Sequence, residues 1–275
     1  MNKFKERCIE LRRLDYTLPE ISKITGRPKS SIYAYIKEIP LSLTKQKSIK
    51  INSGIRISTL STLRKGKSKK EFKKFTKWDP ILVNLISHLV FDGEIKYSRC
   101  VYNNRSQALL DMVENEMRKV YKFEPSKYTN PLTKVSRISY FNVALAKYIK
   151  NKSTELLEGI NYWPKSFKKA FLIAFFDDEG CVDFRIHRRL RRVRGYQKNT
   201  KILDLVKLLL NDFNITSAIH KPNEVVIMGK ENLEKFRQEI NFSPGIYING
   251  NRSNSIWKKS LEKRYILDLA IKSFK

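Results

Sequence analysis

The chain has 275 residues, and 56 Lys and Arg stand against 27 Asp and Glu, a formal net charge of +29 at pH 7. A field of this size and sign attracts polyanions, so the composition favours a nucleic acid as the partner. No uninterrupted apolar run of about 18 residues is present, which argues against a membrane protein. We expect a soluble cytoplasmic protein, associated with the nucleoid, whose three scattered cysteines are reduced.

Residues 1–44 have the pattern of three short helices. A capping-box sequence from Thr17 to Glu20 predicts that the second helix starts at Leu18, and Gly26 suits the tight turn after it. This order predicts a helix-turn-helix module that binds DNA, and the alternative is a three-helix bundle that binds protein. The expected DNA contacts are polar residues of the third helix: Lys29, Ser30, Tyr33 and Lys37.

Residues 45–77 are predicted to be a basic linker. They contain twelve Lys and Arg and one acid, Glu71, a local net charge of +11. Their apolar residues have no period long enough to build a core. We expect this segment to lie along a phosphate backbone, or to be a solvated tether.

After the linker the chain repeats itself weakly, which predicts two related units over residues 78–158 and 159–275. Each unit begins with an apolar helix that ends in an acid followed by glycine, Asp92-Gly93 in one and Glu179-Gly180 in the other. Strand-like residues follow, then an amphipathic helix, over 106–121 and over 200–213, and further strand and helix signals. The pattern indicates an α+β fold of two αββα-type units with a closing helix over 255–274.

The two apolar helices are hydrophobic on most sides, so we expect them to bury each other. Ser87 lies five residues before Asp92 and Ala174 five before Glu179, and small residues at matched positions allow close packing. Parallel packing would bring both acids into one space beside two negative helix ends. A divalent cation would relieve the repulsion, and Mg²⁺, with Mn²⁺ as a substitute, could then support phosphodiester hydrolysis. The alternative is that each acid ends its helix and pairs with Lys or Arg.

The two motifs resemble those of the LAGLIDADG, or dodecapeptide, homing endonucleases. The first reads LISHLVFDG over residues 85–93, and the second, the more similar one, reads LIAFFDDEG over residues 172–180. The resemblance runs from residue 78 to the C-terminus and includes residues 227–242. It implies a monomeric pseudo-dimer in which two αββαββα-type repeats related by a pseudo-twofold form a β-saddle over double-stranded DNA. It also implies that Asp92 and Glu179 are the catalytic acids and hold the metal beside Gly93 and Gly180.

Residues 181–187 alternate, which predicts a strand with Val182, Phe184 and Ile186 on one face. We expect the opposite face to read DNA base edges through Asp183, Arg185 and His187. A loop that grips phosphate is expected to follow, with Arg188, Arg189, Arg191, Arg192 and Arg194. The corresponding candidates in the first half are Lys96 and Ser98.

The chain departs from the family near the expected active site. Family members carry a basic residue after the last strand of a repeat, and residues 242–249 contain no lysine. The candidates to replace it are Lys134, Lys221 and Lys230. We expect His88 to be a packed core residue, and Glu94 to face DNA or a neighbouring base.

These observations favour a site-specific double-strand DNA endonuclease. Two alternatives share the scaffold. One is a DNA-binding regulator without catalysis, as in the WhiA-type transcription factors, and the other is an RNA maturase or splicing factor.

Overall fold

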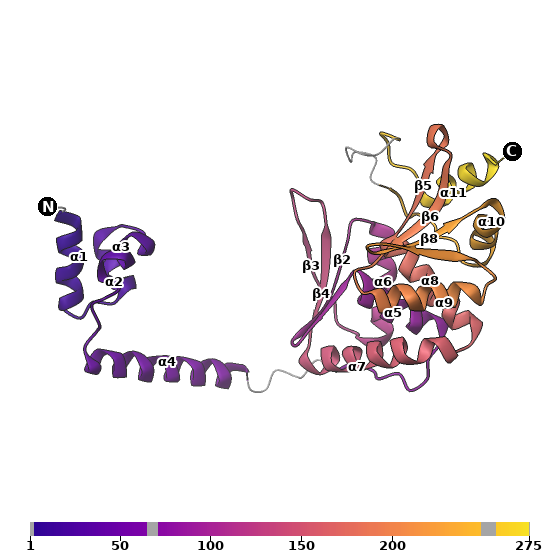
Figure 1. The fold of residues 1–275 in the computed structure, drawn as a ribbon. Coiled ribbons are helices and arrows are strands. Elements are labelled where there is room, and N and C mark those ends of the chain that lie inside the picture. The colour runs from indigo at the N-terminus through magenta and orange to yellow at the C-terminus, as the bar shows by residue number, and fades with distance from the viewer. Residues whose placement is uncertain (1–2, 65–70, 249–256, 275) are drawn as a thin grey trace. The chain divides into compact units, whose positions relative to one another are not determined.

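The computed structural model describes residues 3–64, 71–248 and 257–274. The chain forms two compact units, Met1–Lys69 and Lys70–Lys275 (Figure 1). No helix in the described part of the chain is long and apolar enough to cross a membrane.

The first unit begins with three short helices around a small core. They are α1 (Lys3–Arg13), α2 (Leu18–Thr25) and α3 (Lys29–Ile36), and their core consists of Cys8, Leu11, Ile21, Ile32 and Ile36. Helix α2 starts at the predicted residue because the Thr17 amide donates to the Glu20 carboxylate at 2.6 Å and the Thr17 hydroxyl accepts from the Glu20 amide. Gly26 ends this helix at φ 66°, a left-handed conformation that favours glycine.

Helix α4 (Leu43–Arg64) occupies much of the segment predicted as a linker. The sequence did not predict this helix, because most helices are stabilised by an apolar face packed against other elements. Its described side chains are exposed, apart from the half-buried Lys45, whose Nζ lies 3.4 Å from Glu20 of α2. The segment has no apolar period because the helix buries almost none of its described side chains.

The last part of the predicted linker packs on the second unit. Phe72, Phe75 and Trp78 lie against its hydrophobic core. The Tyr148 hydroxyl accepts from the Phe75 amide at 2.8 Å and donates to the Phe75 carbonyl at 3.0 Å. The second unit therefore starts earlier along the chain than residue 78, where the sequence placed it.

The second unit consists of two αββαββα repeats, each with one four-stranded antiparallel sheet. The first comprises α5 (Pro80–Phe91), β1 (Gly93–Lys96), β2 (Arg99–Asn104), α6 (Gln107–Val120), β3 (Ser126–Thr129), β4 (Ser136–Phe141) and α7 (Val143–Gly159). The second comprises α8 (Lys165–Glu179), β5 (Gly180–Arg185), β6 (Leu190–Tyr196), α9 (Thr200–Asn211), β7 (Ser217–His220), β8 (Glu224–Met228) and α10 (Lys230–Glu239).

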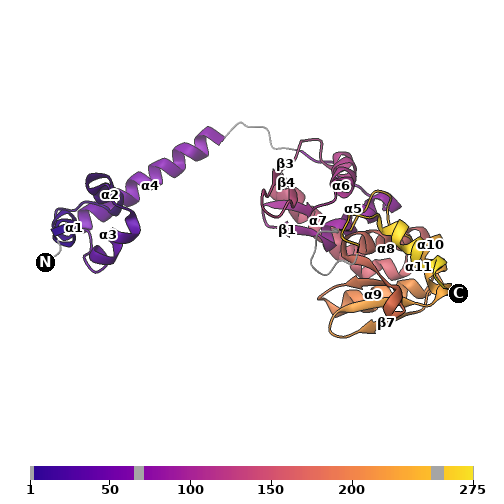
Figure 2. The same cartoon turned by 90° about the horizontal axis from the view of Figure 1, so that it is seen from above.

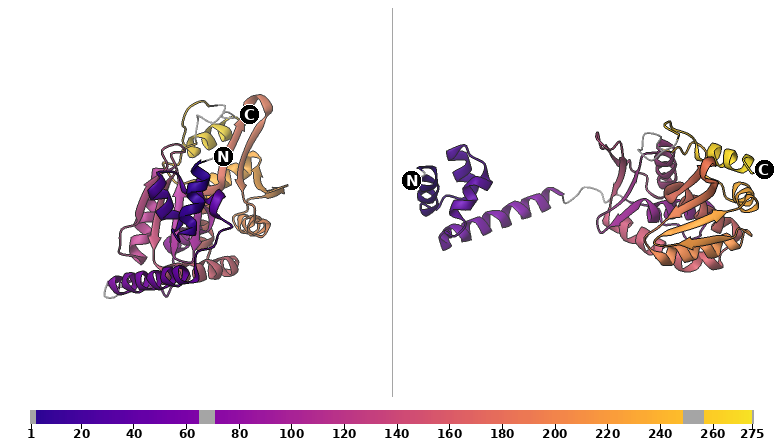
Figure 3. Two further views of the ribbon diagram at one scale, coloured as in Figure 1. Left: turned by 90° about the vertical axis from the view of Figure 1, so that its left-hand side faces the viewer. Right: turned by 45° about the horizontal axis from the view of Figure 1, so that its top comes forward.

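Both sheets have the same topology. Their strand orders are β1-β2-β4-β3 and β5-β6-β8-β7, and the hairpins β3–β4 and β5–β6 project on the side away from α7 (Figures 1 and 3). The predicted α+β fold with two repeats is confirmed. Helix α11 (Lys263–Lys272) closes the chain. It begins later than the predicted closing helix, because residues 257–262 are not helical, and residues 255 and 256 lie outside the described residues.

Helices α5 and α8 form the centre of the second unit (Figure 2). Ser87 and Ala174 are fully buried, as expected for small residues at a close helix contact. The Phe91 ring packs edge-on against Phe171 and Phe175, with centroids 5.3 and 5.2 Å apart. The predicted mutual burial of the two apolar helices is therefore confirmed.

Candidate active site

Helices α5 and α8 run parallel and end together. Asn84 of α5 donates to the Ala170 carbonyl of α8 at 3.3 Å, and one turn later His88 of α5 contacts Asp178 near the end of α8. Both helices pass at once into a strand at a glycine. A Cβ on Gly93 would lie 2.2 Å from the Leu89 carbonyl oxygen, and one on Gly180 2.3 Å from that of Phe176. Glycine is needed at both places because the strand turns back tightly against the helix end.

Asp92 and Glu179, the acids before these glycines, are close enough for the charge of Glu179 to act on Asp92. Both side chains are half-buried. Burial, together with the charges of Asp178 and Glu179, raises the pKa of Asp92 to about 8. Burial and the charge of Asp178 raise the pKa of Glu179 to about 7. Like charges in a desolvated space favour the protonated form, and a bound cation would reverse that preference.

Asp178 is a third carboxylate of the site, and the sequence did not single it out. Its side chain has no exposed surface, and neither has that of His88. Its Oδ2 lies 2.8 Å from His88 Nδ1, and its Oδ1 accepts from the Tyr102 hydroxyl at 2.6 Å. Burial alone lowers the pKa of His88, but the charge and hydrogen bond of Asp178 raise it above its usual value. His88 is therefore packed in the core, as expected, and it also contacts the site.

Lys263 is the lysine that the structure places among the acids. It is the first residue of α11, and its buried Nζ donates to the carbonyls of Asp177 at 2.8 Å and Phe176 at 3.3 Å. Burial lowers its pKa, although the charges of Asp177, Asp178 and Asp92 oppose that effect. No sequence motif marks it.

The lysines proposed as substitutes lie elsewhere in the second unit. Lys134 is in the turn between β3 and β4, Lys221 is in the turn between β7 and β8, and Lys230 begins α10. None of these three is among the residues that line the cavity at the ends of α5 and α8.

That cavity has a volume of about 530 Å³ and is lined by both repeats. Its acidic side contains Asp92, Asp177 and Asp178, with Lys263 beside them, and its other walls include Asn104, Arg105, Arg185 and Arg194. Acidic groups that prefer a cation therefore lie next to guanidinium groups that prefer phosphate.

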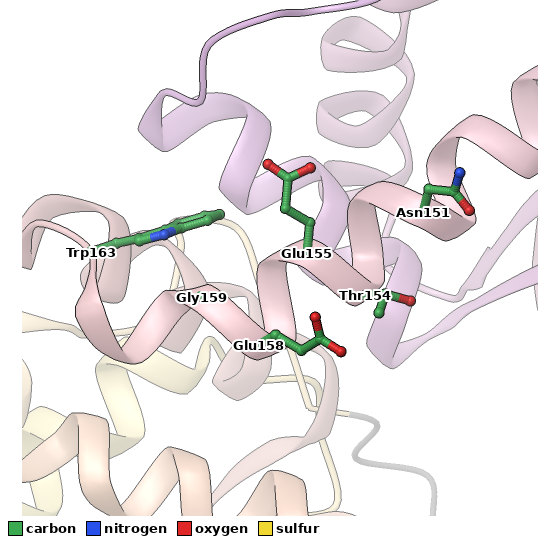
Figure 4. Close-up of a pocket in the computed structure, with 6 residues that line it drawn as sticks. All are labelled: Asn151, Thr154, Glu155, Glu158, Gly159 and Trp163. Atoms are coloured by element: carbon green, nitrogen blue, oxygen red, sulfur yellow. The ribbon is translucent and has the colours of Figure 1, made fainter.

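A second hollow, of about 580 Å³, lies at the other end of α8 (Figure 4). It is lined by Trp163, just before α8, and by the last turns of α7. A helix of 15 residues separates it from Glu179 by roughly 22 Å. The carboxylate of Glu155 in this hollow already accepts from Trp78 Nε1 at 2.6 Å and from Lys152 at 2.8 Å. This hollow is therefore separate from the carboxylates of Asp92, Asp178 and Glu179.

Strand β5 confirms part of the predicted alternation. Val182 and Phe184 are buried, and Asp183 lies opposite Arg192 of β6 on the other face of the sheet. The prediction is wrong for Ile186, whose exposed fraction is 63%. The strand ends at Arg185, and residues Ile186–Arg188 form a 3₁₀ turn, because the chain reverses there into β6.

The side chain of Asp183 is buried under arginines. Its Oδ2 accepts from Arg192 Nε and Nη2 at 3.0 and 2.8 Å, and its Oδ1 accepts from Arg185 Nε at 3.1 Å. A carboxylate held in this way orients two guanidinium groups. The geometry therefore gives Asp183 protein partners where the sequence suggested a cytosine amino group.

The remaining arginines lie on different surfaces. The predicted loop over 188–194 is wrong from Leu190 onward, because Leu190–Tyr196 is strand β6 and pairs with β5 and β8. Arg191 faces the opposite side of the sheet from Asp183 and donates to the Ser273 hydroxyl at 2.6 Å. Arg194 Nη1 donates to Glu224 at 2.8 Å. The exposed polar residues at the hairpin tip are His187, Arg188 and Arg189.

The other predicted DNA contacts are also exposed. Lys96 pairs with Glu94 at 2.7 Å on β1, and Ser98 is in the turn that follows. On α3 the exposed residues include Lys29, Ser30 and Tyr33, while Ile32 and Ile36 face the core; Lys37, just after the helix, is also exposed. This is the two-faced arrangement that the sequence predicted for the third helix.

The donor set at the acids fits a hard divalent cation with few protein ligands. Within the described ranges, no group of three or more His, Cys, Asp and Glu is arranged to hold a metal ion by itself. Mg²⁺ commonly binds one or two carboxylates and completes its shell with water and phosphate. Asp177 Oδ2 is a buried oxygen without a hydrogen-bond partner in the described structure. It adds an unused oxygen that could coordinate a cation at the same helix end.

Residues 166–241, from α8 to just beyond α10, match the family model described as a LAGLIDADG-like domain. The chain contains a LAGLIDADG-like domain. The matched residues include the second motif, which the sequence indicated as the closer of the two, with Glu179 and Gly180. A search of curated proteins found no match.

Several solved structures are similar to this chain. Mesophilic variants of the homing endonuclease I-DmoI are 18% identical, with 60% of this chain and 94% of that chain covered and a TM-score of 0.44. I-DmoI in complex with DNA and Mn is 19% identical, with coverages of 58% and 96% and a TM-score of 0.45. Full-length DUF199/WhiA from Thermatoga maritima is 15% identical, with coverages of 74% and 63% and a TM-score of 0.48.

Proposed function

We propose that this protein is a site-specific endonuclease that cuts double-stranded DNA with Mg²⁺, or Mn²⁺ in its place, held by Asp92 and Glu179. The observation that carries the proposal is the juxtaposition of two half-buried carboxylates with raised pKa values at the ends of paired helices. Such a pair has a strong preference for a divalent cation. A net charge of +29 favours a polyanionic substrate.

Each group of the site has a distinct role in this proposal. A bound cation would activate water and stabilise the leaving 3′ oxygen. Asp92 and Glu179 would bind it, beside the close-packed backbone at Gly93 and Gly180. Arg185 and Arg194 line the cavity that Asp92 lines and would bind backbone phosphate. Lys263 holds the last carbonyls of α8 and so offsets the negative end of that helix.

The proposed substrate contacts extend over both units, and the chain is proposed to act as a monomeric pseudo-dimer. Lys96, Ser98 and the exposed residues of the β5–β6 hairpin would contact the duplex from the two sheets. Helix α3 would add a second DNA contact through its exposed polar face. The basic residues 45–77, which the sequence predicted as a linker, would follow the phosphate backbone.

The test is cleavage of a randomised DNA duplex library by the full chain with Mg²⁺ and with Mn²⁺. We expect double-strand breaks at a restricted set of sequences, and none with Asp92→Asn or Glu179→Gln. Specific binding without cutting in either metal would instead support a regulator without catalysis, a second candidate that the helix-turn-helix unit favours. Preference for structured RNA in competition would support an RNA maturase or splicing factor.

The DNA-binding role of α3 makes a separate prediction. Lys29→Ala removes an exposed ammonium group at the start of this helix, and Lys37→Ala removes one just after its end, so each variant is expected to weaken DNA binding. Each is also expected to lower the slope of log affinity against log salt concentration by about 1. Fluorescence anisotropy across a salt series measures both effects. Lys5→Ala, at an exposed position on α1, is the matched control, and an equal slope in all three variants would contradict the prediction.

A further inference from the structure

A continuous set of hydrogen bonds joins the two motif helices to Asp92. His88 of α5 contacts Asp178 of α8 at 2.8 Å, and the Tyr102 hydroxyl of β2 donates to Asp178 at 2.6 Å. Asn104, two residues further along β2, donates from Nδ2 to the Tyr102 oxygen at 3.2 Å and to Asp92 Oδ2 at 2.8 Å. The Asp92 side chain is therefore connected to the centre of the helix pair.

The hydrogen bonds of Tyr102 and Asn104 in this set can be assigned in only one direction. The single hydroxyl proton of Tyr102 goes to Asp178, so the Tyr102 oxygen can only accept from Asn104. Asn104 Oδ1 accepts from the Ser106 amide at 2.9 Å. The Asn104 carboxamide is thereby fixed with its Nδ2 toward Asp92, and it cannot rotate without breaking hydrogen bonds at both ends.

Burial makes these hydrogen bonds costly to break. His88 and Tyr102 are fully buried, and the Asp178 side chain has no exposed surface. When a buried polar group loses its hydrogen-bond partner, water does not replace that partner. Both oxygens of Asp178 have partners in the protein and its side chain has no exposed surface, which disfavours Asp178 as a ligand of a cation.

The other acid of the site is held differently. Within the described residues, Glu179 accepts a hydrogen bond from Gln197 Nε2 at 3.4 Å, which is long. Asp92 has a partner at 2.8 Å that is itself fixed by two further contacts. The two acids of this site are thus unequal in how firmly the protein holds them.

We propose that Tyr102 and Asp178 are positioning residues that act through Asn104 to hold Asp92 in the orientation that binds the divalent cation. Asp178 in this assignment is a fixed anion next to the metal site and not a third ligand. The inference rests on the proposed function, because it concerns the same metal site. Partners that orient a metal-binding side chain commonly change metal affinity by about 10-fold to 100-fold when they are removed.

The experiment measures Mn²⁺ affinity of the full chain without DNA, by electron paramagnetic resonance of free Mn²⁺ at fixed pH and ionic strength. Tyr102→Phe removes one hydroxyl and is expected to weaken Mn²⁺ binding at least about 10-fold. Tyr140→Phe is the matched control. Tyr140 is 1% exposed on the neighbouring strand β4, and its hydroxyl has no hydrogen-bond partner among the described residues. Its affinity is expected to stay within about twofold of the wild type.

A second pair of variants separates positioning from general loss of structure. His88→Asn keeps a polar amide near the position of Nδ1, whereas His88→Leu has no donor. We expect His88→Asn to retain more Mn²⁺ affinity than His88→Leu, at matched melting temperature.

Two results would count against these statements, and they are distinguishable. Equal Mn²⁺ affinity of Tyr102→Phe and Tyr140→Phe would overturn the positioning role while leaving the metal site in place. Absence of Mn²⁺ binding by the wild-type chain would overturn the proposed metal site, and with it the inference that rests on that site.

Discussion

Asp92→Asn is expected to raise the free energy of unfolding of the metal-free second unit at pH 8.5 while abolishing cleavage. The pKa of Asp92 is raised to about 8 in the folded protein, against about 3.9 in an unfolded chain. Above pH 4 the unfolded chain releases this proton and the folded chain keeps it. Stability is therefore lost as pH rises from about 4 to 8, and the loss is complete above pH 8.

Asparagine does not titrate, so the variant escapes this loss. We expect it to gain about 3 kcal/mol at pH 8.5 and less than about 1 kcal/mol at pH 4.5. Urea unfolding in EDTA, followed by tryptophan fluorescence, measures the difference. The signal reports the second unit alone, because Trp78, Trp163 and Trp257 all lie within it.

Two controls accompany this measurement. Asp204→Asn changes an exposed carboxylate on α9 and is expected to alter stability by less than about 0.5 kcal/mol. Addition of Mg²⁺ is expected to stabilise the wild type and not Asp92→Asn, because only a folded state that binds the ion gains from it. A less stable Asp92→Asn at pH 8.5 would contradict the expected electrostatic strain.

Lys263→Met is expected to have the largest destabilising effect in the second unit. The substitution removes the donor to the Asp177 and Phe176 carbonyls. It also removes the cation that faces the carboxylates of Asp92 and Asp178. Loss of one partner from a buried charge cluster typically costs about 3 to 5 kcal/mol, and we expect about 3 kcal/mol here.

The same tryptophan-monitored urea titration tests this variant. Lys259→Met is the matched control, since Lys259 is exposed in the segment just before α11, and it is expected to change stability by less than about 0.5 kcal/mol. A loss below about 1 kcal/mol for Lys263→Met would mean that water satisfies the two carbonyls and that Lys263 is not needed to hold the end of α8.

The sequence predicted those parts of the site that depend on local pattern. The apolar runs ending at Asp92 and Glu179 and the capping box at Thr17 are visible within a dozen residues, and the structure contains the corresponding helices. Asp178 was adjacent to a predicted site residue and was still missed. Its pairing with His88 depends on how far each helix is rotated about its axis, which hydrophobic periodicity does not fix.

Other features were out of reach because they depend on distant elements. Lys263 enters the site from α11, a helix that packs beside β5 and has no motif of its own. The extent of β5 depends on where the hairpin turns, and residues 186–188 continue the alternating pattern after the strand has ended. Helix α4 buries almost none of its described side chains, so its sequence has no apolar stripe from which a helix could be predicted.

The contact between His88 and Asp178 also determines which repeats can associate. When Gly93 is aligned with Gly180, Phe91 is equivalent to Asp178 and Phe175 is equivalent to His88. Two copies of the first repeat would place His88 against phenylalanine, and two copies of the second would bury Asp178 without its imidazole partner. Either arrangement leaves a buried polar group unpaired. The His88–Asp178 pair therefore stabilises the packing of the first repeat against the second. It disfavours a symmetric dimer of either repeat.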